Sequence, residues 1–93
     1  MSLRYSLPIV QISISKAASK SLNRMPANRA AIIRSKIGTL ADTGLRGELA
    51  NNIAKLQGRE GYRLTIGADR VIFSVEGDIL VIEAVQPRGK AYR

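Results

Sequence analysis

The chain has 93 residues, enough for one small domain around a single core, and 45% of them are hydrophobic, which excludes an intrinsically disordered protein. It contains no cysteine and no histidine, so it offers no disulfide framework, no thiol chemistry and no imidazole for catalysis or metal binding. Fifteen lysines and arginines against seven acidic residues give a formal net charge of +8. This charge is consistent with an anionic partner, for which nucleic acid is the usual case, and equally with a charge that serves solubility alone.

The N-terminal part of the chain carries no recognisable targeting segment. Polar residues interrupt the apolar ones between Leu3 and Ile14, so we expect neither a signal peptide nor a membrane helix. A cytoplasmic protein is therefore expected, and residues 1–93 are expected to form a single domain because no linker or internal repeat divides them.

The first predicted elements are a strand and a short helix. Loose alternation of apolar residues predicts a strand over 7–14, and Pro8 favours either an edge position or a start just after it. A weakly amphipathic helix is predicted over 16–22, with Ser13 or Ser15 as its N-cap.

A longer helix and a connector follow. Pro26 suits a helix start, and an apolar stripe with a spacing of three or four residues predicts a helix over 27–41. The two helices are expected to form an antiparallel hairpin. Residues 44–59 are predicted to be a connector with at most one helical turn, anchored to the core by Ile53 and Leu56.

The last third of the chain shows the alternation that is typical of β-structure. Strands are predicted over 61–66, 70–76 and 79–86, joined by two-residue turns that begin at Gly67 and Gly77. The order of elements predicts an α+β domain: an N-terminal strand, the helical hairpin, and a three-stranded antiparallel meander that completes one sheet with both helices packed on one face.

The first turn of the meander places two arginines on one side of the sheet. A two-residue turn at Gly67 sets Thr65 opposite Arg70 and Arg63 opposite Ile72, and directly opposite residues share a face. Both guanidinium groups should therefore project away from the helices. The alternative is that these arginines are solvated and only discourage pairing with other chains.

The second turn sets the expected register between the last two strands. It predicts that Val71 lies opposite Ala84 in the core and that Arg70 lies opposite Val85 on the other face. Glu83 is expected to neutralise an arginine on that same face.

A basic tail follows the last strand. Arg88 lies just past the strand and Tyr92 four residues later, so both can converge with Arg63 and Arg70 on the helix-free side. Guanidinium groups bind phosphate through paired donors and stay charged at physiological pH, while a tyrosine can stack on a base or take part in proton transfer.

Four stretches together resemble the RelE/ParE family of toxins from bacterial type II toxin–antitoxin systems. They are Lys55-Leu56-Gln57-Gly58, Gly61-Tyr62-Arg63-Leu64, Gly67-Ala68-Asp69-Arg70-Val71-Ile72-Phe73, and Arg88-Gly89-Lys90-Ala91-Tyr92-Arg93. The likeness covers nearly the whole chain and implies the same α+β fold.

The RelE branch consists of endonucleases that cut mRNA in the ribosomal A site without a metal or other cofactor. The resemblance implies attack of a ribose 2′-OH on the adjacent phosphate, with cationic side chains stabilising the developing charge. It assigns the catalytic residues as Arg63, Arg70, Arg88 and Tyr92. The residues expected to contact RNA around them are Lys55, Arg59, Thr65, Lys90 and Arg93.

The chain departs from the RelE branch at two positions, where that branch often carries lysines. These positions hold Arg63 and Thr65, neither of which is an obvious general base, and Lys90 is the nearest substitute. The departure favours the ParE branch, which poisons DNA gyrase, or a weakened enzyme, whereas the Arg88-to-Tyr92 tail favours RelE. A degenerate toxin that only binds its antitoxin is a third alternative.

The resemblance also implies partners. An antitoxin with an acidic, amphipathic tail is expected to fold on this protein and form a hetero-oligomer, and the RelE branch adds the ribosome and mRNA. No metal and no membrane partner is expected.

Overall fold

The computed structural model of the protein describes residue 9 and residues 11–87. Its elements are β1 (Gln11–Ile14), α2 (Lys16–Arg24), α3 (Ala27–Thr43), the 3-10 turn η1 (Ala50–Asn52), β2 (Ile53–Lys55), β3 (Tyr62–Ile66), β4 (Asp69–Glu76) and β5 (Ile79–Pro87). Neither helix in this part of the chain combines the length and apolar character that a membrane crossing requires.

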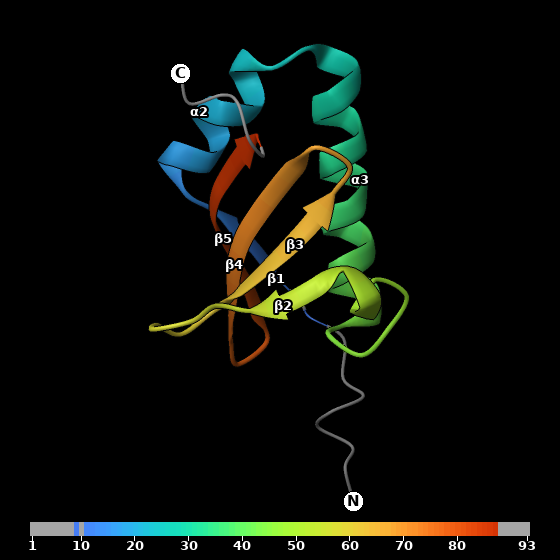
Figure 1. Cartoon of the computed structure of the whole chain (residues 1–93), viewed down its shortest axis with the longest axis vertical. Coiled ribbons are helices and arrows are strands. Elements are labelled where there is room, and N and C mark those ends of the chain that lie inside the picture. The colour runs from blue at the N-terminus through green and yellow to red at the C-terminus, as the bar shows by residue number, and fades with distance from the viewer. Residues whose placement is uncertain (1–8, 10, 88–93) are drawn as a thin grey trace, which may run out of the picture.

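The strands form one sheet in the order β1-β5-β4-β3-β2 (Figure 1). Short β1 pairs in parallel with β5, and all other neighbours are antiparallel. The predicted α+β class, the helical pair and the three-stranded meander are confirmed, as is the edge position of the first strand. The expected connector was wrong in one respect, because after its single helical turn it adds a fifth strand, β2, to the sheet.

Both helices pack on the same face of the sheet and close a single core (Figure 1). The helices contribute mainly aliphatic side chains, Ala18, Leu22, Ala30, Ile33, Ile37, Leu40 and Ala41. The strands contribute Leu64, Val71, Phe73, Leu80, Ile82 and Val85. Each fully buried large side chain of this kind stabilises the fold by about 1.5–3 kcal/mol. Within the described residues, no helix covers the opposite face of β3, β4 and β5.

Local signals set the ends of the two helices. Ser15 is the N-cap of α2, because its Oγ accepts a hydrogen bond from the Ala18 N–H at 2.9 Å. α3 follows Pro26 and runs to Gly44, whose positive φ of 76° suits glycine and whose N–H donates to the Leu40 carbonyl at 2.8 Å. Of the two predicted N-caps, the structure selects Ser15.

A β-bulge interrupts the pairing of β4 with β5. Phe73 pairs with Ile82, but the preceding residue of β4, Ile72, pairs with Ala84. Glu83 is thus the extra residue of the bulge. Because one residue has been inserted, Val85 returns to the core face.

The predicted register of β4 and β5 is therefore wrong beyond the bulge. Val71 pairs with Val85, not with Ala84, and Arg70 pairs with Gln86. The physical reason is that Val71 and Val85 are both buried, whereas strict alternation would have put the smaller Ala84 in the core and turned Val85 outward.

Ser15 satisfies the backbone at this bulge. Its N–H donates to the Ile82 carbonyl at 2.9 Å, and its Oγ donates to the Glu83 carbonyl at 2.7 Å. One serine therefore caps α2 and holds the bulged part of β5 against the start of that helix.

Candidate functional site

The helix-free face carries the two arginines of the meander. Arg63 pairs with Ile72 and Thr65 pairs with Arg70, as the predicted turn at Gly67 required. Because directly paired residues share a face and neighbouring residues along a strand alternate, all four project away from the helices. Arg63 and Arg70 are diagonal neighbours, for which sheet geometry gives a separation of about 7–8 Å.

The immediate surroundings leave both arginines available to an anion. Arg63 and Arg70 are partly exposed, and neither forms an ion pair with another of the described residues. Ile72 lies beside them on the same face and is only 9% exposed. The residue between the two arginines is therefore apolar and largely covered by its neighbours.

Arg59, another predicted RNA contact, has a carboxylate partner. It lies in the loop between β2 and β3, and its terminal nitrogen donates to Oε1 of Glu83 on β5. Glu83 does neutralise an arginine, as expected, but that arginine is Arg59 of the β2–β3 loop and not an arginine on the strands of its own face. The pair is solvated, with side chains 56% and 33% exposed for Arg59 and Glu83.

Lys55 lies apart from the arginine pair. It pairs with Tyr62, whereas its neighbour Ala54 pairs with Arg63, so strand alternation puts Lys55 on the other side of the sheet. It lines a cavity of about 480 Å³ beside the β2–β3 loop. The lining residues are Lys55, Leu56, Arg59, Glu60, Gly61, Tyr62, Ser74 and Val75.

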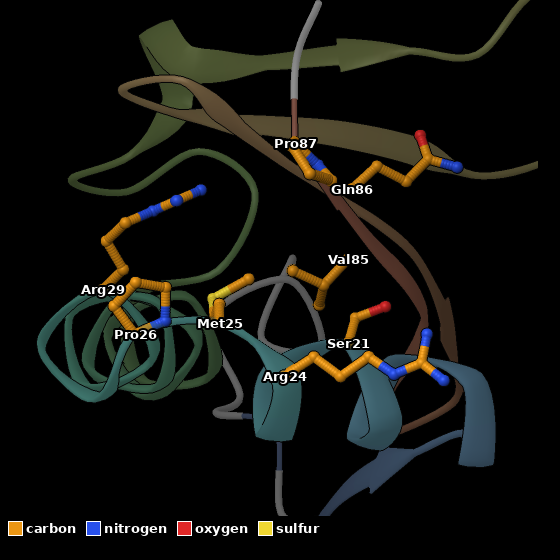
Figure 2. Close-up of a pocket in the computed structure, with 8 residues that line it drawn as sticks. All are labelled: Ser21, Arg24, Met25, Pro26, Arg29, Val85, Gln86 and Pro87. Carbon is orange, nitrogen blue, oxygen red and sulfur yellow. The ribbon is translucent and has the colours of Figure 1, made fainter. Parts of the chain in front are cut away.

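A second cavity, of about 610 Å³, lies between the turn that joins α2 to α3 and the end of β5 (Figure 2). Figure 2 shows the side chains of Met25 and Val85 between Arg24 and Arg29. The remaining lining residues are Ser21, Pro26, Gln86 and Pro87. Gln86 pairs with Arg70, so the cavity adjoins the end of the sheet that carries Arg70.

Arg29 does more than line this cavity. Its Nε donates to Oδ2 of Asp69 at 3.3 Å, and a terminal nitrogen donates to Oδ1 of the same carboxylate. Asp69, at the start of β4, directly precedes Arg70 and faces the helices. Sequence reasoning missed this pair, since 40 positions separate the partners. The sequence did contain one signal for this pair: Asp69 is two residues before Val71 and four before Phe73, so strand alternation puts it on the same face as these core residues.

The predicted site residues of the tail lie outside the described residues. They are Arg88, Lys90, Tyr92 and Arg93. The strand that leads to them, β5, ends at Pro87, which is the register partner of Asp69.

The sequence matches no protein-family model and no curated protein. Solved structures do match it. A chain of the archaeal RelE–RelB complex of Pyrococcus horikoshii OT3 is 26% identical, with 89% of this chain and 99% of that chain covered and a TM-score of 0.73.

Two further structures share the fold at lower identity. The toxin–antitoxin complex RelBE2 of Mycobacterium tuberculosis matches at 19% identity and a TM-score of 0.66, covering 90% of this chain and 95% of that one. The isolated E. coli RelE toxin matches at 15% identity and a TM-score of 0.67, covering 87% and 86%. The chain therefore resembles RelE toxins over nearly its whole length and shares their fold.

Proposed function

We propose that this toxin is a ribosome-dependent mRNA endonuclease of a type II toxin–antitoxin system. The observation that carries the proposal is the placement of Arg63 and Arg70 on one helix-free face, without an ion-pair partner among the described residues. A pair of guanidinium groups at this spacing suits the oxygens of one phosphodiester.

The proposed chemistry is transfer of the phosphate to the neighbouring 2′ oxygen of the RNA. The negative charge on the phosphate oxygens rises as the 2′ oxygen attacks, and Arg63 and Arg70 stabilise that charge. Thr65, the cross-strand partner of Arg70, adds a hydroxyl donor beside it. Arg88 and Tyr92 are proposed to complete the site, and Lys90 and Arg93 to contact the RNA backbone near it.

An antitoxin is the proposed protein partner. The P. horikoshii neighbour is a RelE–RelB complex, and the M. tuberculosis neighbour is a toxin–antitoxin complex. The formal net charge of +8, together with Arg63 and Arg70 that have no ion-pair partner among the described residues, favours a partner segment that is acidic and amphipathic. Covering the same arginines would inhibit the toxin. The site of action proposed here, the ribosome, places the protein in the cytoplasm.

The test is cleavage of mRNA in a purified system. The toxin is incubated with ribosomes stalled on a defined mRNA, and cut positions are mapped by primer extension. Cuts within the codon in the A site, absent from the same mRNA without ribosomes, are expected. Intact mRNA at toxin concentrations that saturate the ribosomes would refute the proposal.

A second candidate function is inhibition of DNA gyrase. It is favoured by Arg63 and Thr65, which leave this face without the paired lysines of the RelE branch. Inhibited DNA supercoiling with intact ribosome-bound mRNA would select it. A third candidate, a degenerate toxin that only binds its antitoxin, predicts no growth arrest when the protein is expressed alone.

A further inference from the structure

The proposed cleavage needs a group that accepts the proton of the 2′-OH. Arg63 and Arg70 cannot serve, since a guanidinium stays protonated in proteins, and the Thr65 hydroxyl is neutral. Among the described residues of β3, β4 and β5, two glutamates share the helix-free face, Glu76 and Glu83. A carboxylate is an ordinary general base for such a step.

The bulge distinguishes Glu83 from Glu76. Glu76 ends β4 and pairs with Ile79 beside the turn, far from the arginines. Glu83 is inserted next to Ala84, whose partner Ile72 pairs in turn with Arg63. Bulges commonly redirect a side chain beside an active site, and Ser15 fixes this one by donating to its carbonyl.

The spacing across the sheet fits a nucleotide. Adjacent strands lie about 4.8 Å apart, so the backbones at Glu83 and Arg63 are separated by about 10 Å, with β4 between them. Both side chains are long enough to reach inward over Ile72. A phosphate held by Arg63 and Arg70 would then have its neighbouring ribose toward Glu83.

The carboxylate has one oxygen engaged and one available. Arg59 donates to Oε1, and Oε2 has no hydrogen bond to another described residue. The Glu83 side chain is 33% exposed, so the carboxylate is partly open to solvent. Arg59 thus orients the carboxylate without occupying both oxygens.

We propose that Glu83 is the general base of the endonuclease, an inference that rests on the proposed function. Oε2 takes the proton of the 2′-OH while the 2′ oxygen forms a bond to phosphorus. The bond from phosphorus to the 5′ oxygen breaks, and that oxygen takes a proton from water. The products are a 2′,3′-cyclic phosphate and a 5′-hydroxyl end.

The experiment compares three substitutions in single-turnover cleavage of ribosome-bound mRNA. Glu83→Gln removes the base with little change of shape. Arg59→Gln breaks the same ion pair but keeps the carboxylate. Glu76→Gln is the matched control for the loss of a negative charge on the same face. Ribosome binding and thermal melting of each variant are measured in parallel.

General base catalysis contributes about 10²–10⁴-fold, so the saturated rate of Glu83→Gln is expected to fall at least 100-fold while ribosome affinity stays within threefold. Glu76→Gln should cleave within twofold of the wild type. Arg59→Gln should be at least tenfold faster than Glu83→Gln at saturation. The cleaved 3′ ends of the wild-type product should carry the cyclic phosphate.

Three other results would overturn the inference, and they can be told apart. A Glu83→Gln rate within threefold of wild type overturns this inference and leaves the proposed endonuclease standing. Equal losses in Glu83→Gln and Arg59→Gln would also overturn it, because the ion pair and not the base would then matter. A wild type that leaves ribosome-bound mRNA intact refutes the proposed function and this inference together.

Discussion

Arg29 on α3 and Asp69 on β4 form a two-point ion pair in which the two partners differ sharply in exposure. The side chain of Asp69 is 7% exposed and that of Arg29 is 41% exposed. The pair ties the first turn of α3 to the β3–β4 hairpin, at the residue directly before Arg70. It is therefore a structural support for the arginine face.

The difference in exposure predicts that removing the arginine lowers the free energy of unfolding more than removing the carboxylate does. Arg29→Met leaves a buried carboxylate without its cation, and we expect a loss of about 3 kcal/mol in the free energy of unfolding. Asp69→Asn leaves a cation that water can solvate and keeps an acceptor, so a loss of about 1 kcal/mol is expected. Urea denaturation of both variants measures the difference. Equal losses, or a larger one in Asp69→Asn, would contradict this description of the pair.

Ser15 supports the fold through two hydrogen bonds of one hydroxyl. It accepts from the Ala18 N–H as N-cap and donates to the Glu83 carbonyl at the bulge. Ser15→Ala should lower the free energy of unfolding by about 1–2 kcal/mol, whereas Ser15→Thr keeps the hydroxyl and should change it by about 0.5 kcal/mol or less. The urea concentration at the midpoint of unfolding measures this change, provided that the slope of the unfolding free energy against urea concentration is the same in all variants. An alanine variant as stable as the wild type would argue against this role.

The first hairpin could be predicted from the sequence because its signals are local. Gly67 fixes a two-residue turn, and the alternation on both sides leaves a single register that buries Leu64 with Val71. That register is also what places Arg63 and Arg70 together. The amino-acid pattern alone therefore predicts the part of the candidate site that lies within one hairpin.

The bulge was not predicted, because strict alternation was assumed along β5. Its signal was the spacing of three between the core residues Ile82 and Val85, which a regular strand cannot place on one face. The short strand β2 was missed because three residues are too few to show a period.

Contacts between segments that are far apart in the sequence could not be predicted from local sequence patterns. Arg59 and Glu83 are 24 positions apart, and only the fold brings the β2–β3 loop within reach of β5. Arg59 and Lys55 were predicted as RNA contacts from the family resemblance, which does not show their neighbours in the fold. The structure gives the first a carboxylate partner and sets the second on the other side of the sheet from Arg63.

The proposed action of Arg63 and Arg70 on RNA is tested most directly by the rate at which Arg70→Ala cleaves ribosome-bound mRNA. Arg46→Ala, which removes an exposed arginine from the loop after α3, is the control for the loss of one positive charge. Primer extension should show cleavage by Arg70→Ala at least 100-fold slower than by the wild type, since donors aimed at developing charge contribute about 10²–10³-fold each. The control should stay within twofold. Cleavage by Arg70→Ala at the wild-type rate would contradict the account.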